Sequence, residues 1–350
     1  MWLSSTNIAD SGLSVELGRL HFEDDRLWWW DEDLDALRLD YERGDVEVAL
    51  SVARELAPAR SDLGSVVPED NRALRLIAEA SWNHRPNHSL HFFGLAVTDH
   101  SPEETIGEIV DNADKDDSDA NLGWLGLRAM GGWESESRGV LGYWIDTAVV
   151  GGRERFLEFD DLSSSASVVG QSTDRSVYGW AFDAGVTWIL PLAADPRVTA
   201  GYAIGSGDGS PFEGADRSFR QTGLHSNEPG LGGVRRFRQY GLLLDPELSN
   251  LSVLTIGVGC SLLASSSVDL VYHHYRLQEP AESLRSARID TTLNGRDRDL
   301  GQAFDLVFAF EEWKRLEVEV SGSLFQAGAA FGVDEHAWVW GGLLNFSVAF

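Results

Sequence analysis

The feature that most constrains the fold is an alternation of apolar residues with small or polar residues, which recurs along nearly the whole chain. In residues 46–53, valine or leucine occupies every second position, and alanine, serine or glutamate occupies the positions between. Similar runs cover residues 74–82, 180–188, 300–310 and 338–350. A period of two is typical of a strand with one apolar face, and no helical period of comparable strength competes with it. The alternation therefore predicts an all-β fold.

The length of these runs separates two kinds of β protein. Most of them extend for about 9 to 12 residues, the length that a tilted strand needs to cross the hydrocarbon core of a bilayer. Strands of soluble sandwiches usually hold about 5 or 6 residues. We therefore expect a transmembrane antiparallel β-barrel, with a soluble sandwich as the alternative.

The connections between the runs alternate strictly between short polar turns and long links, which is typical of outer-membrane barrels. The short turns are Glu42–Asp45, Asn83–His88, Gly131–Ser137, Pro191–Pro196, Ala264–Ser267 and Glu311–Arg315. The long links are Glu23–Asp33, Leu56–Arg72, Asp99–Asn121, Gly151–Arg175, Ser206–Ser249, Leu277–Asp299 and Ala327–His336. The strict alternation requires that Phe237–Leu244 lie inside a link rather than form a strand. It predicts about fourteen strands, with the short turns at one rim and the long links at the other.

Composition excludes several classes of protein. The only cysteine is Cys260, so the chain has no intramolecular disulfide and no paired-cysteine metal site. The sequence contains no run of about 18 apolar residues, so no transmembrane helix is expected. Residues 1–13 lack the pattern of a secretory signal. With 56 acidic against 28 basic residues, the formal net charge is −28, which argues against nucleic acid as a partner.

The last segment, Trp338–Phe350, carries large apolar residues on one face of a strand and mostly small or polar residues on the other. We expect the apolar face to contact outer-membrane lipid and the strand to hydrogen-bond the first strand of a closed sheet. The alternating apolar residues that end at Phe350 also resemble the signal by which the barrel assembly machinery accepts its substrates.

Five segments resemble the alginate-export outer-membrane porin family. They are "GRLHFEDDRLWWWDEDLDALRLDY" (Gly18–Tyr41), "NLGWLGLRAMG" (Asn121–Gly131), "QTGLHSNEPG" (Gln221–Gly230), "LDPELSNL" (Leu244–Leu251) and "DLGQAFDLV" (Asp299–Val307). The resemblance implies an eighteen-stranded, monomeric barrel in the outer membrane of a Gram-negative bacterium, which passes an anionic uronate polysaccharide. By that comparison, residues 1–350 form one barrel domain that lacks about four N-terminal strands and a signal peptide. We therefore expect Leu13–Phe22 and Trp338–Phe350 not to pair fully.

A pathway for a polyanion needs cationic sites that bind weakly, with acidic residues that prevent tight binding. Arginine suits this role because its planar guanidinium group can hold both oxygens of a carboxylate. The predicted pathway residues are Arg19, Arg38, Arg75, Arg128, Arg235, Arg236, Arg238, Asp40, Glu79, Asp183 and Asp305. For the arginines on strands, the alternative is that inward charges only pair across the sheet.

Some of these predictions carry conditions. Arg19 faces inward only if Gly18 forms a bulge. Arg236 occupies a position where the family carries a constriction arginine, whereas Asp245 stands where we would expect another one. If the link Ser206–Ser249 folds inward, we expect Arg236 and Arg238 to point the same way. They would then meet Arg38 or Arg75 across the lumen and form an anion-selective waist.

Two further segments have open interpretations. Trp28–Trp30 are expected to serve as an external aromatic girdle or as loop packing, with sugar platforms as the alternative. The link Asp99–Asn121 holds nine acidic residues and one lysine, and we expect a solvated loop. Calcium binding there is the alternative. Apart from this alternative, no cofactor or metal site is predicted. No catalytic residue is predicted either, because His91, His273 and His274 have no serine and aspartate partners at a spacing that indicates a catalytic triad.

Three functions follow from these observations. The first is passive export of an alginate-like polyuronate, with periplasmic polysaccharide-secretion proteins as further partners. The second is a general or small-solute porin of the same fold, because a net charge of −28 repels polyuronate unless the lumen reverses the field. The third is a barrel that does not transport, either an enzyme or an adhesin.

Overall fold

The computed structural model describes residues 2–57, 66, 72–100, 104–112, 114–116, 118–210, 214–289, 292–313 and 315–348. Within these residues the chain forms one seventeen-stranded sheet. The long strands are β2 (Leu13–Glu23), β3 (Asp31–Arg43), β4 (Val46–Arg54), β5 (Leu74–Arg85), β6 (His88–Thr98), β8 (Ser118–Ser135), β9 (Gly139–Asp161), β10 (Ala166–Ile189), β11 (Arg197–Gly205), β13 (Leu251–Ser261), β14 (Ser267–Leu277), β15 (Asp299–Trp313), β16 (Leu316–Ala327) and β17 (Trp338–Val348). The short elements are β1 (Trp2–Ser5), β7 (Ile109–Asp111), β12 (Ala215–Asp216) and the 3-10 helices η1 (Ile8–Asp10) and η3 (Ala329–Asp334).

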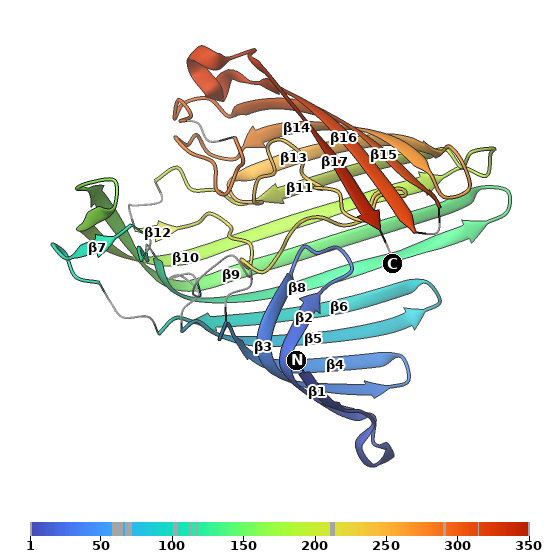
Figure 1. The fold of residues 1–350 in the computed structure, drawn as a ribbon, viewed down its shortest axis with the longest axis horizontal. Helices are drawn as coiled ribbons and strands as arrows, with labels where there is room; N and C mark the ends of the chain where they lie inside the picture. The colour runs from blue at the N-terminus through green and yellow to red at the C-terminus, as the bar shows by residue number, and fades with distance from the viewer. Residues whose placement is uncertain are drawn as a thin grey trace.

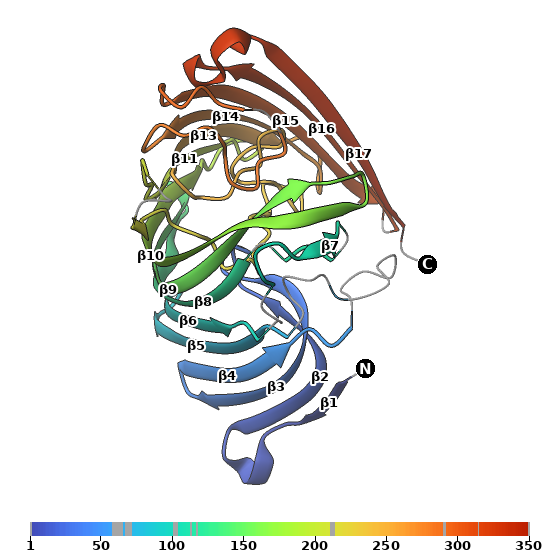
Figure 2. The same cartoon turned by 90° about the vertical axis from the view of Figure 1, so that its left-hand side faces the viewer.

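The fourteen long strands confirm the number predicted from the alternating connections. Each pairs antiparallel with the next long strand in the chain, from β2 to β17. The short strands add to this order, since β1 pairs with β2, whereas β7 and β12 pair with β10. The sheet curls around an interior (Figures 1 and 2), and this concave side is called the interior below.

The two edges of the sheet are β1 and β17, and both lie on its open side in Figure 2. Among the described residues, the residue pairings join β1 to β2 and β17 to β16, and none joins β17 to β2. This agrees with the expected incomplete pairing of Leu13–Phe22 with the last strand. Phe350 lies outside the described residues, and the absence of earlier strands stays a prediction.

The two kinds of connection lie at opposite ends of the strands. In Figure 1 the short turns gather at the right, whereas the connections between β9 and β10 and between β16 and β17 lie at the left, as the alternation predicts. Segment 237–244 forms no strand, which also agrees with the prediction. The described residues contain no helix long and apolar enough to cross a membrane.

The predicted long link Gly151–Arg175 is wrong. Strands β9 and β10 stay paired through this segment as far as Asp161 and Ser167, and they leave only a short turn at the tip. The physical reason is that hydrogen bonding between strands continues beyond the bilayer, where no lipid demands an apolar outer face. The apolar residues at every second position, which mark a membrane strand in the sequence, therefore end before the strand itself ends.

The predicted faces of the strands are correct. On β4, Leu50 and Val52 are about half exposed on the outer face, whereas Ser51 and Ala53 are buried on the interior side. The same division holds on β15, where Leu306 is 52% exposed and Asp305 is fully buried. An apolar outer surface of this kind suits contact with lipid.

Two connections fill the interior. The first is the tryptophan link, residues 24–30 between β2 and β3, and the second is the inner link, residues 206–210 and 214–250 between β11 and β13. Trp28, Trp29 and Trp30 are each at most 2% exposed. The ring of Trp29 stacks on Phe93 of β6 at 4.9 Å between centroids. The expected external girdle is therefore wrong, and the expected loop packing is correct.

Candidate functional site

A cluster of charged residues joins the tryptophan link to the wall of the sheet. Arg128 of β8 donates from Nη1 to Oδ1 of Asp24 at 2.5 Å and from Nε to Oδ1 of Asp146 at 2.6 Å. The side chains of Arg128 and Asp146 are fully buried, and that of Asp24 is 3% exposed. Arg128 also lies 5.1 Å from the ring centroid of Phe93. These contacts anchor the link to β8 and β9 in the interior.

Arg26 extends this cluster to the inner link. It donates to Asp146 at 2.5 Å, to Asp183 of β10 at 3.1 Å and to the side-chain oxygen of Gln239 at 2.8 Å. The hydroxyl of Tyr240 donates to Asp183 at 2.8 Å. We call Asp24, Arg26, Arg128, Asp146 and Asp183 the waist cluster. It holds two arginines and three aspartates, and it ties both interior connections to the wall.

Arg26 and Asp24 were not predicted from the sequence. They lie in a connection, where no strand alternation assigns a direction to a side chain. The one available signal is the position of this charged pair directly before Trp28–Trp30. Three consecutive tryptophans indicate a buried connection, so charged residues beside them should lie inside as well.

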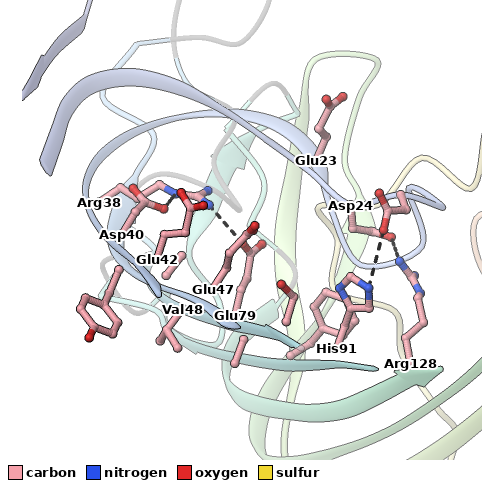
Figure 3. Close-up of a pocket in the computed structure, with 16 residues that line it drawn as sticks. Glu23, Asp24, Arg38, Asp40, Glu42, Glu47, Val48, Glu79, His91 and Arg128 are labelled. Carbon is pink, nitrogen blue, oxygen red and sulfur yellow. Dashed lines mark hydrogen bonds and ion pairs between the residues drawn. The ribbon is translucent and has the colours of Figure 1, made fainter. Parts of the chain in front are cut away.

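Arg38, Asp40 and Glu79 come together in the interior, although the sequence did not indicate that Glu79 would join Arg38. Arg38 donates from Nε to Asp40 at 2.7 Å and from Nη2 to Glu79 at 3.2 Å. These side chains line a cavity of about 410 Å³, the acidic cavity, shown in Figure 3 with Arg128 at its other end. The cavity is lined by two arginines and by the carboxylates of Glu23, Asp24, Asp25, Asp40, Glu42, Glu47 and Glu79. Its electrostatic field therefore favours a cation.

Arg75 lies in a different place. It is buried on β5 and lines a cavity of about 520 Å³ towards the long links, which we call the arginine cavity. Arg175, Arg220 and Arg285 also line this cavity. Arg220 holds Glu154 through both of its Nη atoms, and Arg175 donates to the same carboxylate at 2.6 Å. Arg175 and Arg220 were not predicted, because both lay in segments taken as links and neither belongs to a cluster of arginines in the sequence such as Arg235–Arg238.

The arginines of the inner link have acidic partners. Arg236 donates to both carboxylate oxygens of Asp31, at 2.8 and 3.0 Å, and Arg238 bonds Asp245. Burial raises the pKa of the Asp245 carboxyl to about 6, despite the lowering effect of Arg238. Arg38 pairs with Asp40 and Glu79 instead, and the expected meeting of Arg236 and Arg238 with Arg38 or Arg75 across the lumen stays a prediction. Nearby carboxylates on the links compete for these guanidinium groups.

The other predicted residues lie as follows. Arg235 is 71% exposed and bonds Glu317 on β16. Asp305 is fully buried on β15, accepts a hydrogen bond from the hydroxyl of Ser323 and lies 3.4 Å from Nε2 of His273. Arg19 pairs with Asp35 at 3.1 Å.

The condition set for Arg19 is not met. Residue pairing between β2 and β3 runs without a shift past Gly18, so the strand has no bulge there. Arg19 therefore shares a face with the exposed residues Leu17 and His21, whereas Leu20 is buried on the opposite face. Arg19 lies on the outer face, and the prediction that it lines the pathway is wrong.

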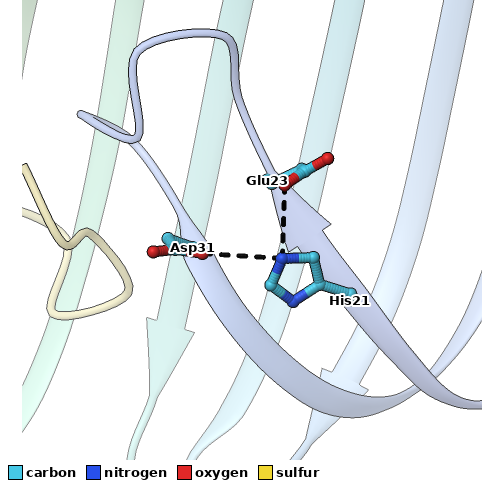
Figure 4. A group of neighbouring side chains, drawn as sticks. All are labelled: His21, Glu23 and Asp31. Atoms are coloured by element: carbon cyan, nitrogen blue, oxygen red, sulfur yellow. Dashed lines mark ion pairs between the residues drawn. The ribbon is translucent and has the colours of Figure 1, made fainter. Parts of the chain in front are cut away.

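In the part of the chain that the structure describes, two groups of acidic or histidine side chains have ligand atoms close enough to hold a cation. His21, Glu23 and Asp31 form one (Figure 4), but Asp31 is already bound by Arg236. The other consists of Asp99, Asp116 and Asp119 in the link Asp99–Asn121. Burial and the neighbouring acidic residues raise the pKa of the nearby Glu104 carboxyl to about 7. The solvated loop stays the prediction for this link, and calcium binding stays its untested alternative.

A common principle governs the interior arginines. Arg26, Arg38, Arg128 and Arg220 each contact more than one carboxylate. A guanidinium group shared in this way can exchange one carboxylate for another without losing all of its charge-assisted hydrogen bonds. The arrangement is therefore suited to hold carboxylates weakly and in succession.

Comparison with known proteins places this geometry in a family. The profile of the alginate export family matches residues 1–337. The alginate production protein AlgE of Pseudomonas aeruginosa is 27% identical over 338 residues, which are 92% of this chain and 67% of the relative. AlgE of Pseudomonas syringae pv. tomato is 24% identical over 357 residues, which are 93% of this chain and 70% of the relative.

Solved structures show the same fold. OccK8 (OprE) of Pseudomonas aeruginosa matches with a TM-score of 0.54 at 9% identity, over 97% of this chain and 77% of the other. OccAB1 of Acinetobacter baumannii matches with a TM-score of 0.53 at 9% identity, over 97% and 74%. The structural neighbours include outer-membrane β-barrel porins. Together with the family match, the fold indicates a channel of the Gram-negative outer membrane rather than an enzyme. The chain belongs to the alginate export family.

Proposed function

We propose that this protein carries an alginate-like polyuronate across the outer membrane by passive diffusion along its interior. The observation that carries the proposal is the waist cluster, in which Arg26 and Arg128 are shared among three aspartates at the point where both interior connections meet the wall. The short turns face the periplasm in barrels of this kind. The polymer therefore meets the waist from the side of the short turns.

The chemistry of the waist fits a polymer that must keep moving. A uronate carboxylate offers the same two oxygens as an aspartate, so it can replace Asp183 at Arg26, whose side chain keeps 10% of its surface exposed. The displaced aspartate then competes for the same guanidinium group and releases the uronate again. Exchange of this kind allows the polymer to bind favourably and still to dissociate, and conduction requires both.

A porin for small solutes is the second candidate, and the acidic cavity favours it. Seven carboxylates line that cavity against two arginines, so a small cation would be concentrated there. A channel governed by this cavity would be cation-selective and indifferent to uronates. The same electrical recording separates the two candidates.

Replacing both Arg236 and Arg238 with alanine tests the role of the inner link. Both groups carry acidic partners and keep part of their surface exposed, at 51% and 29%. We expect the double variant to lose anion selectivity and to bind oligouronate at least about tenfold more weakly, because two exchangeable cations are removed. Reversal potentials in a salt gradient and current block by trimannuronate in planar bilayers measure both effects.

The matched control is Arg19→Ala, which removes an arginine that lies on the outer face and pairs with Asp35. It should leave selectivity and block unchanged. If the double variant keeps the selectivity and block of the wild type, the inner link does not contribute to the pathway. If the wild type itself is cation-selective and not blocked, the small-solute porin is the correct function.

A further inference from the structure

A third cavity lies between the waist cluster and the short turns. Its volume is about 560 Å³, within the range of about 300 to 1,000 Å³ that is usual for small-molecule sites. One side is the inner wall of strands β8 to β13, and the other is the inner link with Phe237 and Tyr240. Arg26 and Asp183 of the waist line it as well. We call it the glycine cavity.

The wall of this cavity is formed by glycines at inward positions on four strands. They are Gly132, Gly142, Gly201 and Gly257. At Gly142 a Cβ atom would meet no other atom closer than 3.9 Å, and at Gly257 none closer than 3.5 Å. Packing of the protein therefore leaves room for a side chain at both positions. Glycine weakens a strand, and inside one it often marks a bulge, a tight bend, or the close approach of a ligand or another backbone. The residue pairings show no bulge at these glycines.

The polar groups of the cavity have capacity for a ligand. The hydroxyls of Thr187 and Thr199 bond to each other at 2.9 Å on the wall, and each can form a further hydrogen bond. The three hydrogen bonds of Arg26 to the described residues use three of its five N–H groups. Asp183 is occupied, because Arg26, Trp144 and Tyr240 all donate to it.

Apolar surface completes the cavity. Met130 and Trp144 from the wall and Phe237 from the inner link contribute it. A pyranose ring presents C–H groups on its faces and hydroxyls at its edge, so it needs apolar surface and hydroxyl partners together. A uronate residue adds one carboxylate, which requires a cation at one end of the site. The glycine cavity has all three, and Asp25 is the other acid that lines it.

We propose that the glycine cavity binds one uronate residue of the polymer before it reaches the waist. The pyranose ring lies against the glycine wall, its hydroxyls bond Thr187 and Thr199, and its carboxylate faces Arg26. This inference rests on the proposed function and names the first saccharide site on the pathway. It differs from the waist because it recognises the ring as well as the charge.

Gly142→Leu tests the site by filling it. The added side chain projects into the cavity, so the dissociation constant for trimannuronate, measured from current block on the short-turn side, should rise about tenfold or more. The control is Gly322→Leu on β16, where no atom lies within 4 Å of an added Cβ and the neighbouring residues Val320 and Leu324 are exposed. Trimannuronate should block this variant with the same dissociation constant as the wild type.

A second variant keeps the test independent of folding. Thr187→Val together with Thr199→Val retains the shape of the wall and removes its hydroxyls, so block by trimannuronate should weaken several-fold at unchanged open-channel conductance. Mannotriose, which has the same rings without carboxylates, should block the wild type more weakly than trimannuronate. Unchanged block in both variants would overturn the site while leaving the proposed function intact. Absence of block in the wild type would overturn both.

Discussion

Replacing Arg128 with methionine should lower the free energy of unfolding by about 3 to 5 kcal/mol, the usual cost of removing one partner from a buried ion pair. Asp24 and Asp146 would remain buried with less compensation, because Arg128 donates to both of them. Methionine keeps most of the volume of the side chain, so the decrease in the free energy of unfolding reflects the missing charge rather than a cavity. Urea unfolding in lipid vesicles, followed by tryptophan fluorescence, measures the change.

Arg235→Met is the matched control, because the same substitution removes an arginine that is 71% exposed. Exposed ion pairs usually contribute about 0 to 1 kcal/mol, so this variant should unfold close to the wild type. Equal destabilisation of the two variants would contradict the assignment of Arg128 as the anchor between the tryptophan link and the wall.

Replacing Trp29 with alanine should both destabilise the protein and open its interior. Trp29 is 1% exposed, stacks on Phe93 and lies directly over Gly126 of β8. Loss of a buried tryptophan typically costs about 3 to 5 kcal/mol. Because the removed ring lies inside the channel, the single-channel conductance should rise, whereas an ordinary core residue would change stability alone.

Trp340→Ala is the control for this variant, since Trp340 is 79% exposed on β17. It should leave the conductance unchanged, because this side chain lies outside the interior. A Trp29→Ala channel with the conductance of the wild type would show that the tryptophan link does not narrow the pathway.

The alternation of the sequence predicted the wall of the interior correctly. Arg38, Arg128, Asp183 and Asp305 all lie on the inner face, because side chains of a strand point to opposite faces in turn. The alternation requires no knowledge of partners, so a single sequence suffices. The prediction that Arg19 faces inward was wrong for the same reason, since it depended on a bulge that the strand does not form.

The partners of these wall residues could not be predicted. Asp24 and Arg26 bond residues more than 100 positions away in the chain, and their link has no periodicity that fixes a direction. Arg220 and Glu154 meet in the same way across 66 positions. Link conformations are determined by tertiary contacts of this kind, which the local sequence does not contain. The glycine cavity was missed for the same reason, because its glycines belong to four strands.

The most direct test of the account is the escape of labelled trimannuronate from lipid vesicles that contain the purified protein. Trimannuronate should leave these vesicles faster than mannotriose of the same size, because the shared arginines favour a carboxylate at each step. The Arg236→Ala, Arg238→Ala variant should remove this preference while both sugars still leave. If trimannuronate stays inside vesicles that release mannotriose, the interior excludes uronates, and the central claim that it conducts a polyuronate is wrong.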